Sequence, residues 1–425
     1  RSPAHRTLSL RVKTCWLTQP VVSINSKRNT PRKPKSFYIL FRQPLDPGRL
    51  FIFRELMPRL LFLEPTDLPA SLYPFSLMRE VVDVPVGLLT LRHKWASFQL
   101  HTGKGLQNRS YSIRANLFPS AACWKQLMRL KEGQSLVDKS GNWLATAGEI
   151  DRFPPGQSSK DGIIYPQAKL IQYPWELLHS LEAGIEMDFL LLTKGRRSQP
   201  VAKSNTVIGK HSVFIERGAR VAAAFFNTEA GPIYIGKNAI VQEGAMMRGP
   251  LLLGDGSLVM MGAKIHGATA IGKGCVVGGE IKRSLIFPYS NKAHDGYMGD
   301  SVIGSWCNWG AGTSNSNLKN TAGMIRIQVG KKQMEVGQKC GVFMGDHTRT
   351  AINTSLNSGS VFGVSVQLGK EGVVSGRIPS FRWMDGKRYR LKEALEHIRS
   401  WKSLKGKVLL DAEIDQLKQI YKQDK

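Results

Sequence analysis

The stretch GPIYIGKNAIVQEGAMMR, which begins at Gly231, is followed directly by two stretches of the same design. GPLLLGDGSLVMMGAKIH begins at Gly249 and GATAIGKGCVVGGEIKRS begins at Gly267, so each stretch starts where the one before it ends. Neither the 3.6-residue period of an amphipathic helix nor the two-residue period of a strand predicts the spacing inside this repeat. An aliphatic residue returns there every six residues, at Ile235, Val241, Met247, Leu253, Val259, Ile265, Ile271 and Val277.

A period of six indicates a solenoid with triangular coils. Six residues make one short strand and one corner, and three such sides close a coil. Four residues after each aliphatic position lies a second, mostly small residue, as at Ala239, Ala245 and Ala263, which suits a column where the corners crowd the axis. Glycine supplies the backbone freedom that corners demand. The pattern is that of a hexapeptide β-helix, with the six-spaced aliphatic side chains stacked inside.

The six-residue pattern returns at Ile303 and again from Met344 onward. We therefore expect one parallel β-helix over residues 200–375, with two interruptions near 283–301 and 314–342. The first interruption contains SNKAHDGYMG, a polar stretch that we expect to stand off the coil as a loop. Functional residues concentrate on such loops.

The sequence on either side of the solenoid predicts three further parts. Residues 1–36 hold nine Lys or Arg and no acidic residue. They are expected to be a disordered basic tail, either a targeting segment or sequence foreign to the working protein. Residues 37–199 are expected to form an α/β domain, and residues 376–425 a helical cap on the last coil or on a neighbouring subunit.

Within the front part, three stretches carry the secondary-structure prediction. SLMREVVDVPVGLLTLRHKW contains an apolar run that reads as a strand, whereas SAACWKQLMRLKEG and the stretch from about Trp175 read as helices. No Gly-x-Gly-x-x-Gly motif and no P-loop motif occurs in this front part.

Composition limits the partners that we expect. The 425 residues include 60 Lys and Arg against 32 Asp and Glu, a formal net charge of +28. A basic chain suggests nucleic-acid binding as one function. No recognition motif supports it, so no nucleic-acid partner is expected. No apolar run reaches the roughly 18 residues of a membrane span, so no membrane partner is expected. The five cysteines form no Cys-x-x-Cys pair, which favours reduced thiols in a cytoplasmic protein and no metal site.

The motifs around the first interruption are the most specific in the chain. Residues 280–320 read EIKRSLIFPYSNKAHDGYMGDSVIGSWCNWGAGTSNSNLKN. This stretch resembles the acetyltransferase half of the bifunctional N-acetylglucosamine-1-phosphate uridyltransferase/glucosamine-1-phosphate acetyltransferase. With GPIYIG, GDHT, INT and PVGLLTLRHKW, the chain is still more similar to a divergent bacterial family of sugar nucleotidyltransferases related to that enzyme. The resemblance implies a left-handed β-helix behind a degenerate nucleotidyltransferase-like α/β domain.

The resemblance also implies a set of functional residues. His294 matches a histidine that acts as general base, and Ala311 matches a position that binds coenzyme A. The residues that match substrate-binding positions are Lys264, Lys282, Tyr297, Asn308 and Asn317. His347, in FMGDHTRTAIN, is a second catalytic candidate. Members of this class work as homotrimers, so a homotrimer is expected here as well.

The implied chemistry agrees with the residue types. An amine that attacks a thioester must lose a proton, and an imidazole with an ordinary pKa of about 6.5 suits that task near neutral pH. Lysine side chains can hold an anionic phosphate as compact point charges. The leading hypothesis is an acyltransferase or acetyltransferase that uses acetyl-coenzyme A and a sugar or sugar phosphate. The alternative for His294 is a loop histidine with only a structural hydrogen bond.

Two other functions remain open. Nucleotidyl transfer by the front part would require Mg²⁺ and a glycine-rich loop that cradles the nucleotide triphosphate, yet SFYILFRQPLDPGRLFIF stands in that place. The third hypothesis is a non-catalytic trimeric scaffold. Binding of coenzyme A separates the first hypothesis from the third, and turnover of a nucleotide triphosphate separates the second from both.

Overall fold

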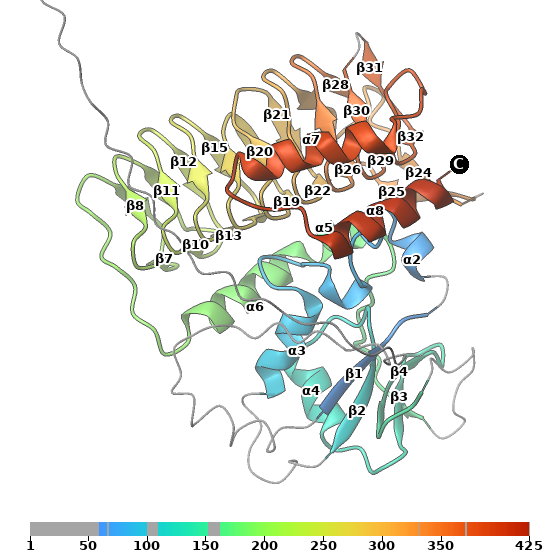
Figure 1. The fold of residues 1–425 in the computed structure, drawn as a ribbon. Coiled ribbons are helices and arrows are strands. Elements are labelled where there is room, and N and C mark those ends of the chain that lie inside the picture. The colour runs from blue at the N-terminus through green and yellow to red at the C-terminus, as the bar shows by residue number, and fades with distance from the viewer. Residues whose placement is uncertain are drawn as a thin grey trace, which may run out of the picture. The chain divides into compact units, whose positions relative to one another are not determined.

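The computed structural model describes residues 59–65, 68–99, 109–151, 162–330, 332–369 and 372–424 (Figure 1). The expected basic tail, residues 1–36, lies outside these ranges.

The front part is built on a mixed five-stranded sheet in the order β1-β2-β4-β3-β5. Strands β1 and β2 are parallel, as are β3 and β5, whereas β4 runs antiparallel to both of its neighbours. The strands are β1 (Arg59–Leu63), β2 (Ser110–Arg114), β3 (Ser135–Val137), β4 (Trp143–Ala147) and β5 (Ile163–Ile164). The helices are α2 (Leu68–Ser71), the 3₁₀ turn η1 (Val81–Asp83), α3 (Leu91–Gln99), α4 (Ala121–Leu127), α5 (Pro174–His179) and α6 (Leu181–Thr193). An α/β front part is therefore confirmed.

The expected strand in SLMREVVDVPVGLLTLRHKW is wrong, because the segment forms η1 and α3. Its apolar residues are buried by a compact turn, in which Gly87 takes a φ of +112°. The carboxylate of Asp188, on α6, accepts hydrogen bonds from the backbone N–H groups of Leu88 and Leu89 at 2.7 and 2.9 Å. Lys94 forms a fully buried ion pair with the same carboxylate. A short apolar run cannot by itself distinguish a strand from such a turn.

The expected parallel solenoid is confirmed, and most coils contribute one short strand to each of three faces (Figure 1). The first face is β7 (Val213–Ile215), β10 (Ile233–Ile235), β13 (Leu251–Leu253), β16 (Thr269–Ile271), β19 (Leu285–Ile286), β22 (Val302–Ile303), β26 (Phe343–Met344), β29 (Val361–Phe362) and β32 (Arg377–Ile378). The second is β8 (Arg220–Val221), β11 (Ile240–Val241), β14 (Leu258–Val259), β17 (Val276–Val277), β20 (Asn291–Lys292), β27 (Arg349–Thr350) and β30 (Gln367–Leu368). The third is β6 (Thr206–Ile208), β9 (Phe225–Asn227), β12 (Met246–Arg248), β15 (Lys264–His266), β18 (Glu280–Lys282), β21 (Tyr297–Gly299), β23 (Ser314–Asn315), β28 (Ser355–Leu356) and β31 (Val373–Val374).

The inward positions of the solenoid are those that the six-residue pattern predicts. All eight six-spaced aliphatic side chains are at most 2% exposed, and the small residues between them are fully buried. Ile235, Leu253 and Ile271 pair in register on successive strands of the first face. Stacking identical positions in this way gives one continuous apolar core, which a single coil could not form alone.

The expected loop at residues 283–301 is wrong, because the coil continues through it. In the preceding coils, Leu252 pairs with Ala270. Ala270 in turn pairs with Leu285, and these two partners are closer in the sequence than Leu252 and Ala270 are. The partners Glu280 and Tyr297 are also closer in the sequence than partners in the preceding coils. The corners are shortened, which breaks the six-residue spacing in the sequence without breaking the stack of strands.

The second expected interruption is a true excursion. Val302 pairs with Phe343, so the chain leaves the solenoid after β23 and returns before β26 within one pair of neighbouring coils. The inserted chain includes the antiparallel hairpin β24 (Ile325–Val329) and β25 (Lys332–Gly337). The hairpin side chains Ile325, Ile327 and Val336 are buried in the same apolar cluster as the front part.

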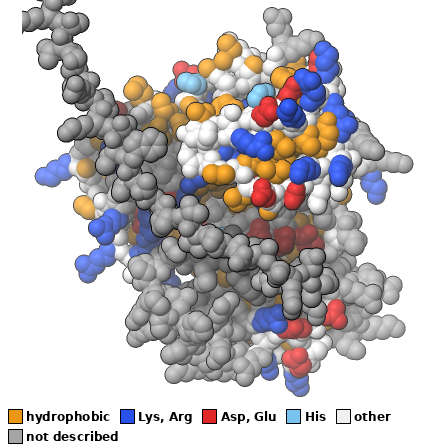
Figure 2. Space-filling model, viewed as in Figure 1, with side chains coloured by type: hydrophobic (Ala, Val, Ile, Leu, Met, Phe, Trp, Pro, Cys, Tyr) orange, Lys and Arg blue, Asp and Glu red, His pale blue; other side chains and the backbone are white. Residues whose placement is uncertain are grey.

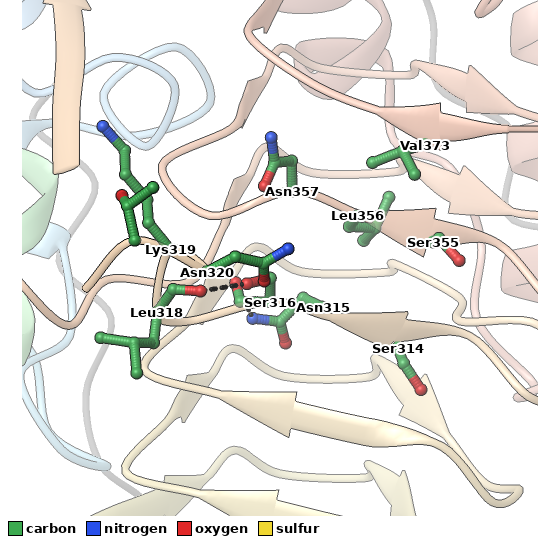
Figure 3. A pocket seen from close by; sticks show the side chains of 11 residues that line it. Ser314, Asn315, Ser316, Leu318, Lys319, Asn320, Ser355, Leu356, Asn357 and Val373 are labelled. Carbon is green, nitrogen blue, oxygen red and sulfur yellow. Dashed lines mark hydrogen bonds between the residues drawn. The ribbon is translucent and has the colours of Figure 1, made fainter. Parts of the chain in front are cut away.

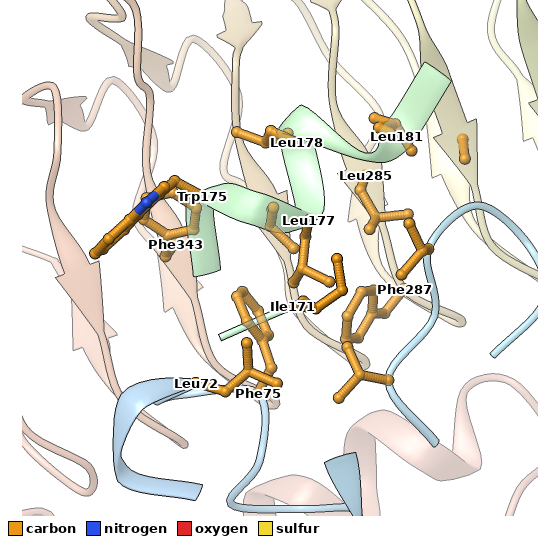
Figure 4. Packing of buried hydrophobic residues seen from close by; sticks show 14 of the residues in the cluster. Leu72, Phe75, Ile171, Trp175, Leu177, Leu178, Leu181, Leu285, Phe287 and Phe343 are labelled. Atoms are coloured by element: carbon orange, nitrogen blue, oxygen red, sulfur yellow. The ribbon is translucent and has the colours of Figure 1, made fainter. Parts of the chain in front are cut away.

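Two of the three faces are covered. Figure 4 shows Trp175, Leu177, Leu178 and Leu181, from α5 and α6, together with Leu285, Phe287 and Phe343 of the solenoid; all belong to one apolar cluster at the first face. The two C-terminal helices are α7 (Leu391–Ser403) and α8 (Asp411–Gln423). On the second face, Lys405, just after α7, donates hydrogen bonds to the carbonyl of Gly274 and to Oδ1 of Asn291 at 2.6 and 2.8 Å. The helical segment therefore reaches back across several coils.

In the part of the chain that the structure describes, no helix is long and apolar enough to cross a membrane.

Candidate functional site

The third face brings together four of the predicted substrate-binding residues. Because Ile265, Ile281 and Met298 point inward, the residues on either side of each one point outward. Lys264, Glu280 and Tyr297 therefore form one outward row on β15, β18 and β21. His266, Lys282 and Gly299 form the next row, and Asn317 follows β23 on the same face.

Tyr297 and Asn317 are in direct contact. The Nδ2 atom of Asn317 donates a hydrogen bond to the phenol oxygen of Tyr297 at 3.1 Å. A Cβ added at Gly299 would lie 2.3 Å from that phenol oxygen, so the Tyr297 ring lies directly over Gly299 and would have to move if a side chain stood there. The phenol is thereby held beside Lys282, whose strand neighbour is Gly299.

A buried carboxylate orients this pair. Asp300, 1% exposed, accepts hydrogen bonds from Asn317 and from the guanidinium of Arg283, with which it forms an ion pair. Burial, followed by the negative charges of Asp300 and Glu280, raises the pKa of Tyr297. The phenol therefore stays protonated at neutral pH and can donate a hydrogen bond to a ligand. Sequence reasoning missed Asp300 and Arg283, since neither their spacing nor their type marks them as partners across two coils.

His294 lies at the corner that joins the second and third faces, between β20 and β21. Its side chain is exposed, and its backbone carbonyl accepts a hydrogen bond from Nζ of Lys292 at 2.5 Å. Ala311 occupies the equivalent corner of the following coil, where the N–H of Gly312 donates to the carbonyl of Asp295 at 3.0 Å. His294 and Ala311 thus border the face that carries Tyr297.

Lys292 is a residue that the sequence reasoning did not single out. Its strand partner is Val277, an inward position, and only 3% of Lys292 is exposed. Burial lowers its pKa to about 8, although the charge of Asp295 acts in the opposite direction. The shortened coil hides this inward position, because Lys292 follows Val277 sooner than the six-residue pattern allows.

The other two predicted residues lie elsewhere. Asn308 sits on the second face, in a parallel bridge between Asn291 and Arg349, so the corner of Ala311 separates it from Tyr297. His347 occupies the corner between the first and second faces, with a φ of +62° and 1% exposure. The structure does not bring the imidazole of His347 to the third face.

The third face continues into an open pocket of about 620 Å³. Ser314, Ser355 and Asn357 line it with hydroxyl and amide groups, and Leu356 and Val373 contribute apolar surface (Figure 3). Lys319 lies at its margin and donates to the carbonyl of Met324 at 2.7 Å. Hydroxyl and amide groups beside a small apolar surface suit a polyhydroxylated ligand.

Metal-ligating residues do not gather at this site. Over the described ranges, no group of three His, Cys, Asp or Glu side chains is placed so that it could hold a metal ion.

Comparison with known proteins finds one family match and several distant relatives. Residues 61–197 match the family model described as sugar nucleotidyl transferase. The bifunctional protein GlmU of Methanocaldococcus jannaschii is 33% identical over 101 residues, which cover 24% of this chain and 25% of that protein. The bifunctional sugar-1-phosphate nucleotidylyltransferase/acetyltransferase of Sulfurisphaera tokodaii is 36% identical over 97 residues, covering 23% and 24%. The chain thus spans about a quarter of the length of these curated relatives.

Among solved structures, the UDP-N-acetylglucosamine acyltransferase of Francisella novicida is 12% identical, with a TM-score of 0.27, and covers 51% of this chain and 89% of that one. AntD, an N-acyltransferase of Bacillus cereus solved with dTDP and coenzyme A, is 13% identical, with a TM-score of 0.18, and covers 41% and 79%. Residues 61–197 therefore match the sugar nucleotidyl transferase family, and about a quarter of the chain is distantly similar to bifunctional GlmU proteins.

Proposed function

We propose that the protein is an acyltransferase or acetyltransferase that transfers an acyl group from acetyl-coenzyme A to a sugar or sugar phosphate. One observation carries this proposal. Lys264, Lys282, Tyr297 and Asn317 share one solenoid face, and the exposed His294 stands at its border. Two ammonium groups, a phenol and an amide form a surface that can hold a phosphate and orient hydroxyl groups.

In this proposal each side chain has one task. Lys264 and Lys282 hold the anionic end of the acceptor, while Tyr297 and Asn317 orient it by hydrogen bonds. His294 removes the proton from the acceptor's amine or hydroxyl group as the new bond to the acyl carbon forms. The proton then passes to the departing thiolate.

The edge at Ala311 suits an extended donor molecule. A Cβ added at Gly310 would lie 2.3 Å from the carbonyl oxygen of Ala351, and one at Gly278 would lie 2.2 Å from that of Ala293. Close stacking therefore keeps the position just before Ala311 small, and likewise its equivalents in the neighbouring coils. A narrow group such as the pantetheine arm of coenzyme A could lie against an edge of this kind, with Ala311 beside its reactive end.

A screen with acetyl-coenzyme A and a panel of amino sugars and sugar phosphates tests the proposal, with release of free thiol as the readout. We expect at least one acceptor to give turnover that depends on His294. Absence of turnover across the panel, together with absence of coenzyme A binding by calorimetry, would favour the trimeric scaffold instead.

Nucleotidyl transfer is the second candidate, and the match of residues 61–197 to the sugar nucleotidyl transferase family favours it. The stretch 36–53, where a glycine-rich loop would be expected, lies outside the described residues. Incubation with sugar-1-phosphates, nucleotide triphosphates and Mg²⁺ should release pyrophosphate if this activity is present. Release that persists in His294→Ala would assign it to the front part.

A further inference from the structure

Two successive coils present the same pair of polar positions under the C-terminal helices. His347 and Arg349 lie at the corner and on the second face of one coil, and Ser365 and Gln367 take the equivalent places on the next. Arg349 and Gln367 are register partners on β27 and β30, so their side chains are neighbours about 5 Å apart along the face.

His347, Arg349 and Ser365 are buried and Gln367 is half-buried, yet several of their polar atoms have no partner among the described residues. His347 is 1% exposed, Ser365 0% and Arg349 8%. Among the described residues, no hydrogen-bond partner is present for Nδ1 of His347, Nε and Nη2 of Arg349, Oγ of Ser365 or Nε2 of Gln367. Buried polar groups are almost always paired, so a cluster of unpaired ones points to a missing ligand or to ordered water.

The charge of Arg349 distinguishes between a ligand and water. Neighbouring cations have carboxylate partners, since Arg79 pairs with Asp346 and Lys402 with Glu413. Arg349 has no such partner among the described residues; its Nη1 donates to the carbonyl of His347 at 3.1 Å. Burial lowers the pKa of Arg349 only to about 10, so it remains charged at neutral pH. An unpaired buried charge is costly, and water alone does not neutralise it.

An aromatic ring lies against the guanidinium of the cluster, and aromatic residues occupy the neighbouring corners. The guanidinium of Arg349 lies 4.9 Å from the ring centroid of Trp401, on α7. Trp306 occupies the equivalent corner of the preceding coil and Phe381 that of the following coil. Figure 2 shows Lys and Arg side chains interspersed with acidic and hydrophobic ones over α7 and α8. The ring of Trp401 over the guanidinium and the positive charge of Arg349 favour a small anion over a large ligand.

We propose that Arg349, Gln367, Ser365 and His347 form a binding site for a small oxyanion, of phosphate or sulfate size, between the second face and α7. A planar guanidinium donates two parallel hydrogen bonds to such an anion, and the amide, hydroxyl and imidazole groups complete its coordination. His347 is then a ligand-binding residue. This site does not depend on the acyltransferase proposal, because Tyr297 and His294 lie on the third face and at another corner.

Titration of the full chain with inorganic phosphate, in phosphate-free buffer at constant ionic strength, tests the site. We expect a saturable rise in melting temperature, since a ligand that binds only the folded state stabilises it. Arg349→Met should weaken the apparent affinity by about tenfold or more, the scale of a lost charge-assisted hydrogen bond. Arg220→Met is the matched control, because Arg220 occupies the equivalent outward position on β8 and is exposed.

Two results would overturn the proposal: no saturable effect of phosphate on the wild type, which leaves ordered water as the partner, or an equal effect on Arg349→Met. If that variant does not fold, Gln367→Leu removes one donor without removing a charge, and it should weaken phosphate binding by roughly threefold to tenfold. Unchanged binding in Gln367→Leu would then count against the site. Coenzyme A forms a second arm: Arg349-dependent stabilisation at far lower concentration than phosphate would identify its phosphate groups as the source.

Discussion

His294 has the most direct test at the scale of single residues. Its side chain is exposed at a corner, so His294→Ala should leave the melting temperature almost unchanged. Turnover of an established acyl transfer should fall by roughly 10²–10⁴-fold, the usual contribution of a general base. Steady-state kinetics on both proteins provide the measurement, with His211→Ala, another exposed histidine on an early coil, as the control.

Lys282→Ala should behave differently in the same assay. Phosphate binding is shared by the ground state and the transition state, so the change should raise KM more than it lowers kcat. Small and equal effects of His294→Ala and Lys282→Ala on kcat would contradict the assigned roles and leave the His294 corner with a structural one.

Lys292 gives a prediction that depends on pH. Its pKa is about 8 in the folded protein, below the ordinary value of 10.5, so the unfolded chain binds more protons between these two values. Stability therefore rises with pH across this window as the buried ammonium is lost. Lys292→Met removes the charge but keeps the apolar stem, and should be more stable than the wild type at pH 7.

The difference in stability between Lys292→Met and the wild type should narrow as the pH increases from about 8 to 10. Thermal melts of both proteins at each pH provide the measurement. A constant or widening difference in stability would show that the buried Lys292 ammonium does not destabilise the folded protein. Because its Nζ binds the carbonyl of His294, Lys292→Met should also reduce acyl transfer despite its greater stability.

At the scale of elements, the sequence predicts the regularly spaced strands of the solenoid but not the coils in which the spacing changes. The repeat pattern places Ile235, Val241 and Met247 inside the solenoid, as found. It fails at Lys292 and Tyr297 because corners of the coil are shorter there, and a change in spacing looks the same as a loop. The length of a corner depends on backbone geometry, and the residue types in this stretch do not indicate that geometry.

The candidate site was predictable to a similar degree. Lys264, Lys282, Tyr297 and Asn317 do share a face, as spacing and resemblance together suggest. The contact of Asp300 with Arg283 and Asn317 was not predictable, because it joins side chains of different coils through the excursion after β23. The separate face of Asn308 follows from its place on the other side of a corner.

The hairpin β24–β25 provides the prediction for this scale. Ile327 is 3% exposed in the apolar cluster at the first face, so Ile327→Ala should lower the free energy of unfolding by about 2–4 kcal/mol. Gln328→Ala, at the exposed neighbouring position, should change it by less than about 0.5 kcal/mol. Chemical denaturation of both variants supplies the comparison, and equal small losses would mean that the hairpin is not part of the core.

At the scale of the whole molecule, the three faces have different surroundings. The first is covered by α5 and α6, and the second is crossed by the C-terminal helical segment. The third exposes a row of apolar side chains next to its polar site: Phe225 is 47% exposed and Met246 51%. On β6, Val207 and Ile208 are 43% and 50% exposed. A contiguous apolar patch of this kind marks an interaction surface.

We expect the occupant of this patch to be a second copy of the chain, in a homotrimer whose cyclic symmetry forms three identical clefts. Phe225 and Met246 are register partners on β9 and β12, and their row continues to Lys264 and Tyr297. An interface over the apolar end of the row would therefore bring a neighbouring subunit to the edge of the polar site.

Met246→Glu should dissociate the trimer, because it places a charge in the apolar part of the interface. Light scattering at micromolar concentration should give three times the chain mass for the wild type and the single-chain mass for the variant. Val408→Glu introduces the same charge at a side chain that is 76% exposed in the loop between α7 and α8, and should remain trimeric. A monodisperse wild-type monomer would contradict the expected subunit interface. His294 and its partners would then have to act within one chain.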